Sequence, residues 1–114
     1  EGDKSIENQL ISKNILKGIT ATCGGFYAPQ GRKLRLTPSD SKFLKNLQNF
    51  TFEGFKITNF EMETSAIFGL SKLLGHQACS MNAILANRTN GTFSNSPEKT
   101  IDALIQYTLD KLID

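Results

Sequence analysis

The sequence predicts a layered α/β fold, and three observations support this prediction. Segments with helical periodicity alternate with short runs of β-branched and small apolar residues in the order α-β-α-β-α-β-α. The third such run, Ala78 to Ala86, is almost continuously small and apolar, which is typical of a strand covered on both faces. Three strands are fewer than the about four to six of a usual sheet, so we expect further strands upstream of this chain.

Two helices are predicted in the first half of the chain. The first spans residues 5–16 and stops before Gly18, with these apolar positions at roughly helical spacing: Ile6, Leu10, Ile15 and Leu16. The second begins at Ser39 or Ser41 and ends near residue 47, and three of its residues are expected to face inward: Phe43, Leu44 and Leu47.

Two further helices are predicted in the second half. The third covers residues 63–74, with Lys72 in its last turn and Gly75 where a left-handed cap is expected. One face of it is apolar: Ala66, Ile67, Leu70, Leu73 and Leu74. The fourth begins at the run Ser96-Pro97-Glu98 and continues to the end of the chain. Its apolar face is equally regular: Ile101, Leu104, Ile105, Leu109 and Leu112.

Strands and loops fill the intervals between these helices. The first strand is expected over Ile19 to Cys23 and the second over Phe55 to Met62, because both contain β-branched or aromatic residues. Polar or glycine-containing stretches are expected to be loops or turns: residues 24–38, residues 49–54 around Gly54, and residues 87–95.

Composition restricts the classes of function. The chain has 114 residues, of which 39% are hydrophobic and 21% charged, as in a globular domain or a piece of one. A net charge of +2 leaves no basic patch for nucleic acid, and no run approaches the ~20 apolar residues that span a membrane. Cys23 and Cys79 have no metal-ligand spacing and are expected to be buried free thiols in a cytoplasmic protein. The chain starts at Glu1, with neither an initiator Met nor a signal peptide, so residues upstream are allowed.

Familiar catalytic motifs are absent from the sequence. There is no phosphate-cradling G-x-x-x-x-G-K, no G-x-G-x-x-G and no zinc motif. The single histidine, His76, follows a helix-ending glycine and is expected at the surface. Periodicity and spacing alone therefore indicate an α/β domain and no particular reaction.

Three segments, in their order and separation, resemble the uridine phosphorylase branch of the nucleoside phosphorylases. They are Gly18-Ile-Thr-Ala-Thr-Cys-Gly-Gly-Phe-Tyr-Ala-Pro-Gln-Gly-Arg32, Asn59-Phe-Glu-Met-Glu-Thr-Ser-Ala-Ile67 and Ile84-Leu-Ala-Asn-Arg-Thr89. The Phe-Tyr-x-x-Gln-x-Arg pattern marks the pyrimidine-specific branch, whereas Glu-Met-Glu is shared with purine phosphorylases and nucleosidases. The resemblance extends over essentially the whole chain.

The first segment is predicted to bind the base. Uracil has a carbonyl–NH–carbonyl edge, a Gln amide offers one donor and one acceptor, and an Arg offers only donors. Gln30 and Arg32 are therefore expected to read O2, N3 and O4 together. The resemblance implies that Phe26 packs against sugar and base. Without the resemblance, an exposed polar loop would be the favoured interpretation.

The second segment is predicted to bind the ribose. Glu63 would accept hydrogen bonds from the two ribose hydroxyls, because a carboxylate is an acceptor of two such bonds. The resemblance implies that Met62 lies beside the ribose and that Glu61 belongs to the same turn. A first-turn helix acid and a core methionine are the alternatives for Glu63 and Met62.

The third segment is expected to close the base site. Leu85 and Ala86 would form a wall, and Asn87 and Arg88 would begin a flap. Purine-cleaving relatives carry an Asp near this point, and its absence favours a pyrimidine. Two departures from the family leave the preference among uridine, deoxyuridine and thymidine open: Ala28-Pro29 between the Tyr and the Gln, and Gly31 in place of an acid.

The resemblance implies a three-layer α/β/α sandwich of which residues 1–114 are the C-terminal part, without the N-terminal phosphate-binding part. It implies reversible phosphorolysis of uridine by a homo-oligomer, with no cofactor, with phosphate as co-substrate and with no side-chain nucleophile or acid. The fragment alone is expected to be inactive. Two alternatives remain: a purine nucleoside phosphorylase or nucleosidase, and a non-catalytic nucleobase-binding domain.

Overall fold

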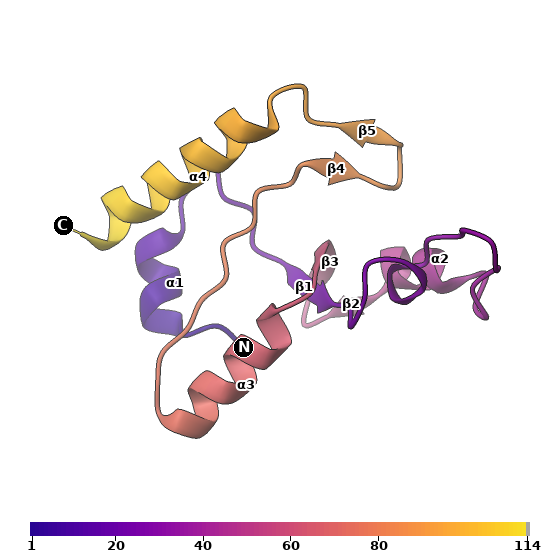
Figure 1. Ribbon diagram of the computed structural model, residues 1–114. Coiled ribbons are helices and arrows are strands. Elements are labelled where there is room, and N and C mark those ends of the chain that lie inside the picture. The colour runs from indigo at the N-terminus through magenta and orange to yellow at the C-terminus, as the bar shows by residue number, and fades with distance from the viewer. Residues whose placement is uncertain (114) are drawn as a thin grey trace. The chain divides into compact units, whose positions relative to one another are not determined.

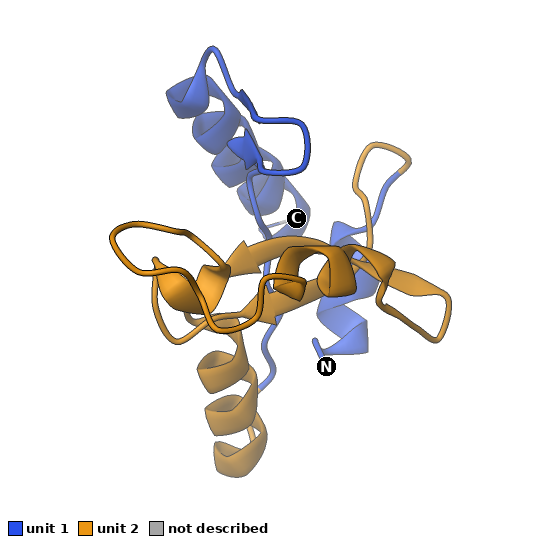
Figure 2. Ribbon diagram, turned by 90° about the vertical axis from the view of Figure 1, so that its right-hand side faces the viewer, with its two compact units in different colours: residues 1–12, 77–114 blue, residues 13–76 orange. Residues whose placement is uncertain are grey.

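A computed structural model describes residues 1–113, and the chain divides into two compact units (Figure 2). Unit 1 contains residues 1–12 and the chain from residue 77 onward, and unit 2 contains residues 13–76. Helices and strands are interspersed along the chain (Figure 1), so the mixed α/β composition is as predicted. The predicted three-layer sandwich stays a prediction. Among residues 1–113, no helix has the length and apolar character needed to cross a membrane.

Unit 2 contains a three-stranded sheet with the order β1-β3-β2. Strand β1 (Ile19–Thr22) is parallel to β3 (Phe55–Glu61), and β2 (Thr51–Phe52) is antiparallel to β3. Both predicted long strands are therefore confirmed to within one residue. The crossover between β1 and β3 contains the short 3₁₀ helix η1 (Ala28–Gln30) and helix α2 (Phe43–Asn49).

The hairpin between β2 and β3 includes a short strand in residues 49–54, for which the sequence predicts an irregular segment or a turn around Gly54. Its two-residue turn places Glu53 at φ 49° and Gly54 at φ 81°. Two successive positive φ angles give the turn that matches the twist of an antiparallel hairpin. The predicted turn at Gly54 is thus correct, and the strand before it escapes prediction because only two of its residues pair.

Helix α2 also starts later than predicted. Neither Ser39 nor Ser41 caps it; instead, the Asp40 side chain accepts a hydrogen bond from the Lys42 N–H at 2.8 Å, just before the helix. Phe43, expected to face inward, packs against Phe60 of β3 with ring centroids 6.5 Å apart. This contact holds α2 against the sheet.

Helix α3 (Thr64–Leu74) follows β3 directly and ends as predicted. Gly75 adopts φ 75°, and its N–H donates to the carbonyl of Ser71, so it closes the helix in the left-handed conformation that glycine favours. Lys72 lies in the last turn, and exposed His76 follows, as expected.

Unit 1 packs helix α1 (Lys4–Leu10) against helix α4 (Pro97–Leu112). Asp3 caps α1 by accepting hydrogen bonds from two backbone N–H groups, and the Tyr107 hydroxyl of α4 donates to the Leu10 carbonyl at 2.6 Å. The prediction of a helix through residue 16 is wrong, because Ile11 already has an extended backbone with ψ 138°. The helix ends at Leu10, which is 3% exposed, whereas Ile11 is 51% exposed.

The predicted third strand is also wrong. The structure assigns no strand to residues 77–85, and the short strand β4 (Ala86–Asn87) instead pairs antiparallel with β5 (Thr92–Phe93). The expected loop at 87–95 is therefore mostly a hairpin. A strand requires a neighbouring backbone as well as a suitable sequence, and no strand of the described chain pairs with residues 77–85.

Few apolar side chains of the described residues are fully buried. Leu10 and Cys23 are the buried hydrophobic residues, at 3% and 8% exposure, and both cysteines are free thiols, with Cys79 half-buried. The predicted apolar faces of α3 and α4 are largely exposed: Ile67, Leu70, Leu73, Leu74, Ile101, Ile105, Leu109 and Leu112. The helices thus have the predicted apolar faces, but the other described residues do not cover these faces.

Candidate functional site

Two loops that carry predicted site residues leave the same edge of the unit 2 sheet. The last residues of the parallel strands β1 and β3, Thr22 and Glu61, are paired, and the Cys23 N–H donates to the Glu61 carbonyl at 2.9 Å. The loop with Gln30 and Arg32 follows β1, and Met62 and Glu63 follow β3. Ligands of open α/β sheets bind outside the carboxyl ends of the strands. The topology therefore places both predicted motifs at a suitable edge.

The predicted base-binding side chains meet within the first loop. Arg32 Nη1 donates hydrogen bonds to Gln30 Oε1 and to the Phe26 carbonyl. The guanidinium carbon of Arg32 also lies 3.7 Å from the centroid of the Phe26 ring, a cation–π contact. Gln30 is only 5% exposed and Arg32 is half-buried, so the two head groups do not extend into bulk solvent.

The backbone of this loop is held by its own hydrogen bonds. The Tyr27 carbonyl accepts from the N–H groups of Gln30 at 3.1 Å and Arg32 at 2.9 Å, and the Ala28 carbonyl accepts from Gly31 at 2.8 Å. Phe26 and Tyr27 pack edge to face with centroids 5.3 Å apart. The Gln30 and Arg32 side chains are therefore oriented before any ligand arrives, which lowers the entropy cost of binding.

The structure explains why glycine occupies position 31. Gly31 adopts φ 69°, and a Cβ built there would lie 3.0 Å from Phe43 Cδ1 and 3.3 Å from Leu44 Cγ of α2. A side chain at this position, such as the acid that the sequence resemblance leads us to expect, would require a different loop conformation or a shift of α2. The glycine at position 31 thus has a local structural cause.

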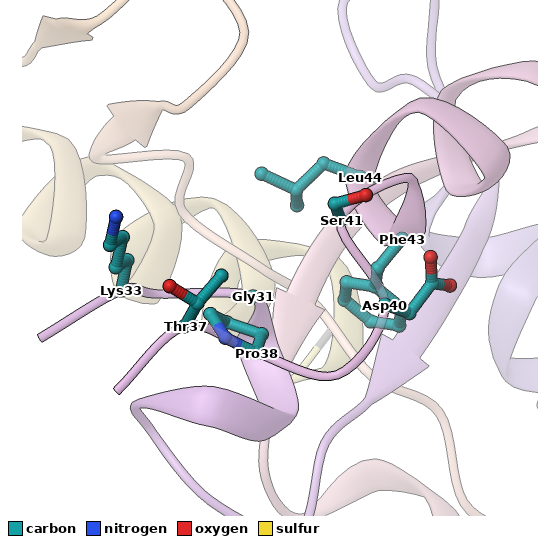
Figure 3. A pocket seen from close by; sticks show the side chains of 8 residues that line it. All are labelled: Gly31, Lys33, Thr37, Pro38, Asp40, Ser41, Phe43 and Leu44. Carbon is teal, nitrogen blue, oxygen red and sulfur yellow. The ribbon is translucent and has the colours of Figure 1, made fainter. Parts of the chain in front are cut away.

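A half-open hollow of about 220 Å³ lies between this loop and α2 (Figure 3). It is lined by Gly31, Lys33, Thr37, Pro38, Asp40, Ser41, Phe43 and Leu44. None of the predicted base contacts lines it, and it is smaller than the ~300–1,000 Å³ of typical ligand pockets. We therefore do not assign it as the base site.

The carboxylate of Glu61 is used inside the fold. Its Oε1 accepts a hydrogen bond from the Thr22 hydroxyl, and its Oε2 accepts from the N–H groups of Glu63 at 2.5 Å and Thr64 at 2.6 Å. Burial raises the pKa of Glu61, but hydrogen bonds from Thr22, the two N–H groups and the Thr64 hydroxyl outweigh burial and lower the pKa below its ordinary value. Glu61 thus caps helix α3.

Glu63 and Met62 are more accessible. Both side chains are exposed, and Glu63 Oε2 accepts one hydrogen bond, from the Met62 N–H at 3.2 Å. The carboxylate of Glu63 lies at the residue before the first turn of α3, where the helix dipole favours a negative charge. Of the two acids in Glu-Met-Glu, Glu63 is the one whose carboxylate is available to a ligand in this conformation.

The predicted wall and flap residues lie in unit 1. The Leu85 carbonyl accepts a hydrogen bond from Ser94 N–H at 2.8 Å, and Ala86 and Asn87 form β4. Asn87 Oδ1 accepts from the Thr89 N–H at 3.0 Å, which shapes the hairpin turn that contains half-buried Arg88. Their contact with a base stays a prediction.

Thr22 lies at the candidate site, although its sequence pattern does not single it out. It joins the end of β1 to the start of α3, because its hydroxyl donates to Glu61 and accepts from the Ser65 N–H at 3.0 Å. A hydroxyl on the last strand residue before a Gly-Gly loop is the available signal, but Thr is so common in strands that this signal is weak. Within residues 1–113, no three His, Cys, Asp or Glu side chains gather as a metal site would require.

The comparison with curated proteins finds a uridine phosphorylase from Thermococcus kodakarensis. It is 35% identical to this chain over 82 residues, which are 72% of the chain but 29% of the relative. The chain therefore spans less than a third of the length of the relative that it matches. No family model matches the chain, and no solved structure matches it. The match supports a relationship to the nucleoside phosphorylases and, at that general level, to glycosyl-transferring enzymes of nucleotide metabolism.

Proposed function

We propose that these residues supply the base and ribose contacts of an enzyme that converts uridine and phosphate reversibly into uracil and ribose 1-phosphate. One observation carries the proposal: the Gln30 amide and the Arg32 guanidinium are joined on a hydrogen-bonded loop at the carboxyl edge of the sheet. Their chemistry complements the edge of a pyrimidine, and the similarity to a uridine phosphorylase supports the same class of substrate.

The joined pair has donors and acceptors in the proportion that uracil needs. An amide oxygen has two lone pairs, so Gln30 Oε1 is able to accept both from Arg32 and from uracil N3–H. When uracil binds, the Gln30 amide would exchange its present contacts for the ligand, and its NH₂ and the Arg32 guanidinium would donate to the two carbonyl oxygens of uracil. Cytosine presents an amino group in place of O4 and an acceptor at N3, so the same pair would repel it.

Donation to the uracil carbonyls would also assist bond cleavage. A phosphate oxygen forms a bond to ribose C1′ while the bond from C1′ to base N1 breaks, and the electron pair of that bond leaves with the base. Fixed donors around the carbonyls stabilise the negative charge that develops there, and a solvent proton then neutralises N1. Glu63 would hold the two ribose hydroxyls, with Met62 and Phe26 as apolar contacts.

The phosphate contacts would come from outside these residues. No Gly-rich phosphate loop occurs in the sequence, and the chain matches under a third of its relative. The exposed apolar faces of α3 and α4 have the properties of surfaces that another part of the same enzyme would cover. We therefore propose a homo-oligomeric cytoplasmic enzyme, with phosphate as co-substrate and no cofactor.

The test uses the full-length product of the gene and, separately, residues 1–114, each with a panel of nucleosides with and without phosphate. The proposal expects phosphate-dependent release of uracil from uridine by the full-length product and none by residues 1–114. Release of free ribose without phosphate would instead indicate a nucleosidase, and a preference for inosine would indicate a purine phosphorylase. Either result, or no release at all, would overturn the proposal.

A further inference from the structure

We infer that Thr22 is a positioning residue that sets Glu63 for the ribose, an inference that rests on the proposed function. Thr22 is the last residue of β1, and its hydroxyl makes two hydrogen bonds to the segment that follows β3. It donates to the Glu61 carboxylate and accepts from the Ser65 N–H at 3.0 Å. Thr22 thus contacts residues on both sides of Glu63.

The bonds made by Glu61 complete this arrangement. The same carboxylate that accepts from Thr22 also accepts from the N–H of Glu63 itself at 2.5 Å and from the N–H of Thr64 at 2.6 Å. Thr64 is 6% exposed, so the first residue of α3 is held in the interior of unit 2. One hydroxyl and one carboxylate therefore fix the backbone that carries the Glu63 side chain.

On its carbonyl side, the Glu63 backbone is held by the helix, because that carbonyl accepts from the N–H groups of Ala66 and Ile67 at 3.1 Å each; its N–H is held by Glu61. Glu63 precedes the first residue of α3 and has φ −125° and ψ −29°, outside helical geometry, and its own side chain does not cap the helix. A rotation of its backbone would move the carboxylate away from a ribose bound at the sheet edge. Misplacement of a positioning contact by about 1 Å is sufficient to weaken binding and catalysis substantially.

The inference predicts that one substitution changes the affinity for uridine but not the affinity for uracil, although the two ligands share a base. Thr22→Val keeps the shape of the side chain but removes the hydroxyl, so Glu61 loses a donor and Ser65 N–H loses an acceptor. Uridine, which has a ribose, should bind about tenfold more weakly to this variant, because a misplaced Glu63 carboxylate would lose a charge-assisted hydrogen bond to the ribose hydroxyls. Uracil has no ribose and would make no hydrogen bond with Glu63. Its affinity for the variant should therefore stay within about twofold of its affinity for the wild type.

Thr20→Val is the matched control. Thr20 lies two residues earlier on the same face of β1, and its hydroxyl donates to Asn59 Oδ1 at 3.0 Å, away from Glu63. Its removal should change neither ligand's affinity, whereas Thr22→Ser, which keeps the hydroxyl, should restore uridine binding.

Affinities are measured by calorimetry on the full-length gene product, with thermal unfolding as a check on each variant. Equal loss of uridine and uracil affinity in Thr22→Val, or no loss of either, would overturn the inference while leaving the proposed function standing. Failure of the wild type to bind either ligand would remove the proposed function and this inference together. If Thr22→Val does not fold, Glu61→Gln replaces it, because this substitution weakens the same contacts. The same loss of uridine affinity with little change in uracil affinity is then expected, and the same outcomes would overturn the inference.

Discussion

At the scale of single residues, the two acids of Glu61-Met62-Glu63 have different surroundings. Glu61 accepts hydrogen bonds from Thr22, Glu63 and Thr64, whereas Glu63 is exposed. The sequence could not distinguish them, because both acids flank one methionine at the start of a predicted helix. The distinction depends on which residue of β1 lies opposite, and that is a property of the strand register.

The residue-scale prediction concerns the pH dependence of stability. In the folded chain the pKa of Glu61 lies below its ordinary value of 4.5, so the ionised carboxylate stabilises the fold fully above pH 4.5. This stabilisation is lost as the pH falls through the folded pKa. Glu61→Gln should therefore lower the free energy of unfolding by about 1–2 kcal/mol at pH 7, and the difference from the wild type should shrink below pH 4.5.

Chemical denaturation at several pH values measures this difference. Glu63→Gln is the matched control, because Glu63 makes one longer hydrogen bond, at 3.2 Å. Its effect on stability at pH 7 should be below about 0.5 kcal/mol, as at most surface positions. A Glu61→Gln variant as stable as the wild type at pH 7 would show that the cap has no energetic role.

At the scale of elements, the sequence predicts the features that depend on neighbours along the chain. The ends of α3, the left-handed Gly75, the start of α4 and the two long strands of unit 2 follow the predicted positions within one residue. The failures involve partners far along the chain. The run at 78–86 has strand composition, but only Ala86 of this run joins a ladder, and the first helix ends at Leu10, whose carbonyl accepts a hydrogen bond from Tyr107 of α4.

In the candidate site too, the sequence predicts local features but not contacts between distant residues. The residue types in the Gln30 and Arg32 loop could be predicted from their pattern, and the loop and the Glu-Met-Glu turn do follow adjacent parallel strands. The bond between the two head groups, the close approach of α2 to Gly31 and the contacts of Thr22 are tertiary, so no local pattern specifies them.

At this scale we predict opposite effects on stability for substitutions at two glycines, one inside helix α3 and one at its end. Gly69 lies in the interior of α3 with open space where an added methyl group would lie, whereas Gly75 caps the helix at φ 75°. Gly69→Ala should stabilise the chain by about 0.5–1 kcal/mol, because alanine favours a helix and loses less entropy on folding. Gly75→Ala should destabilise it by about 1 kcal/mol, because a Cβ is strained in that conformation.

Thermal or denaturant unfolding followed by circular dichroism measures both variants. The opposite signs provide an internal control, since both substitutions add one methyl group at the same helix. If both variants were destabilised equally, the helix would not extend over Thr64–Leu74 as described.

At the scale of the whole molecule, the described residues expose apolar helix faces and bury few apolar side chains. Exposed patches of this kind mark surfaces that another chain or another part of a protein covers. The chain also spans less than a third of a uridine phosphorylase relative. Both facts support our proposal that the present residues are one portion of a larger assembly.

The corresponding prediction is concentration-dependent association of residues 1–114. Leu70 on α3 is exposed, and Leu70→Lys should reduce the association because a charge disrupts an apolar contact. Leu36→Lys is the control, since Leu36 is exposed in the loop before α2 rather than on an apolar helix face. Sedimentation velocity over a wide range of protein concentrations measures this association. A chain that stays monomeric at every concentration, or equal effects of the two substitutions on association, would contradict the prediction.

The central claim is that Gln30 and Arg32 together recognise the edge of a pyrimidine, and calorimetric titration of the full-length gene product with uracil and cytosine tests it most directly. We expect uracil to bind and cytosine to bind at least about tenfold more weakly, because the pair presents donors where cytosine has an amino group. Arg32→Lys should weaken uracil binding about tenfold or more, and Arg35→Lys, in the same loop, should not. Equal affinity for the two bases, or an Arg32→Lys variant that binds uracil as the wild type does, would contradict the claim.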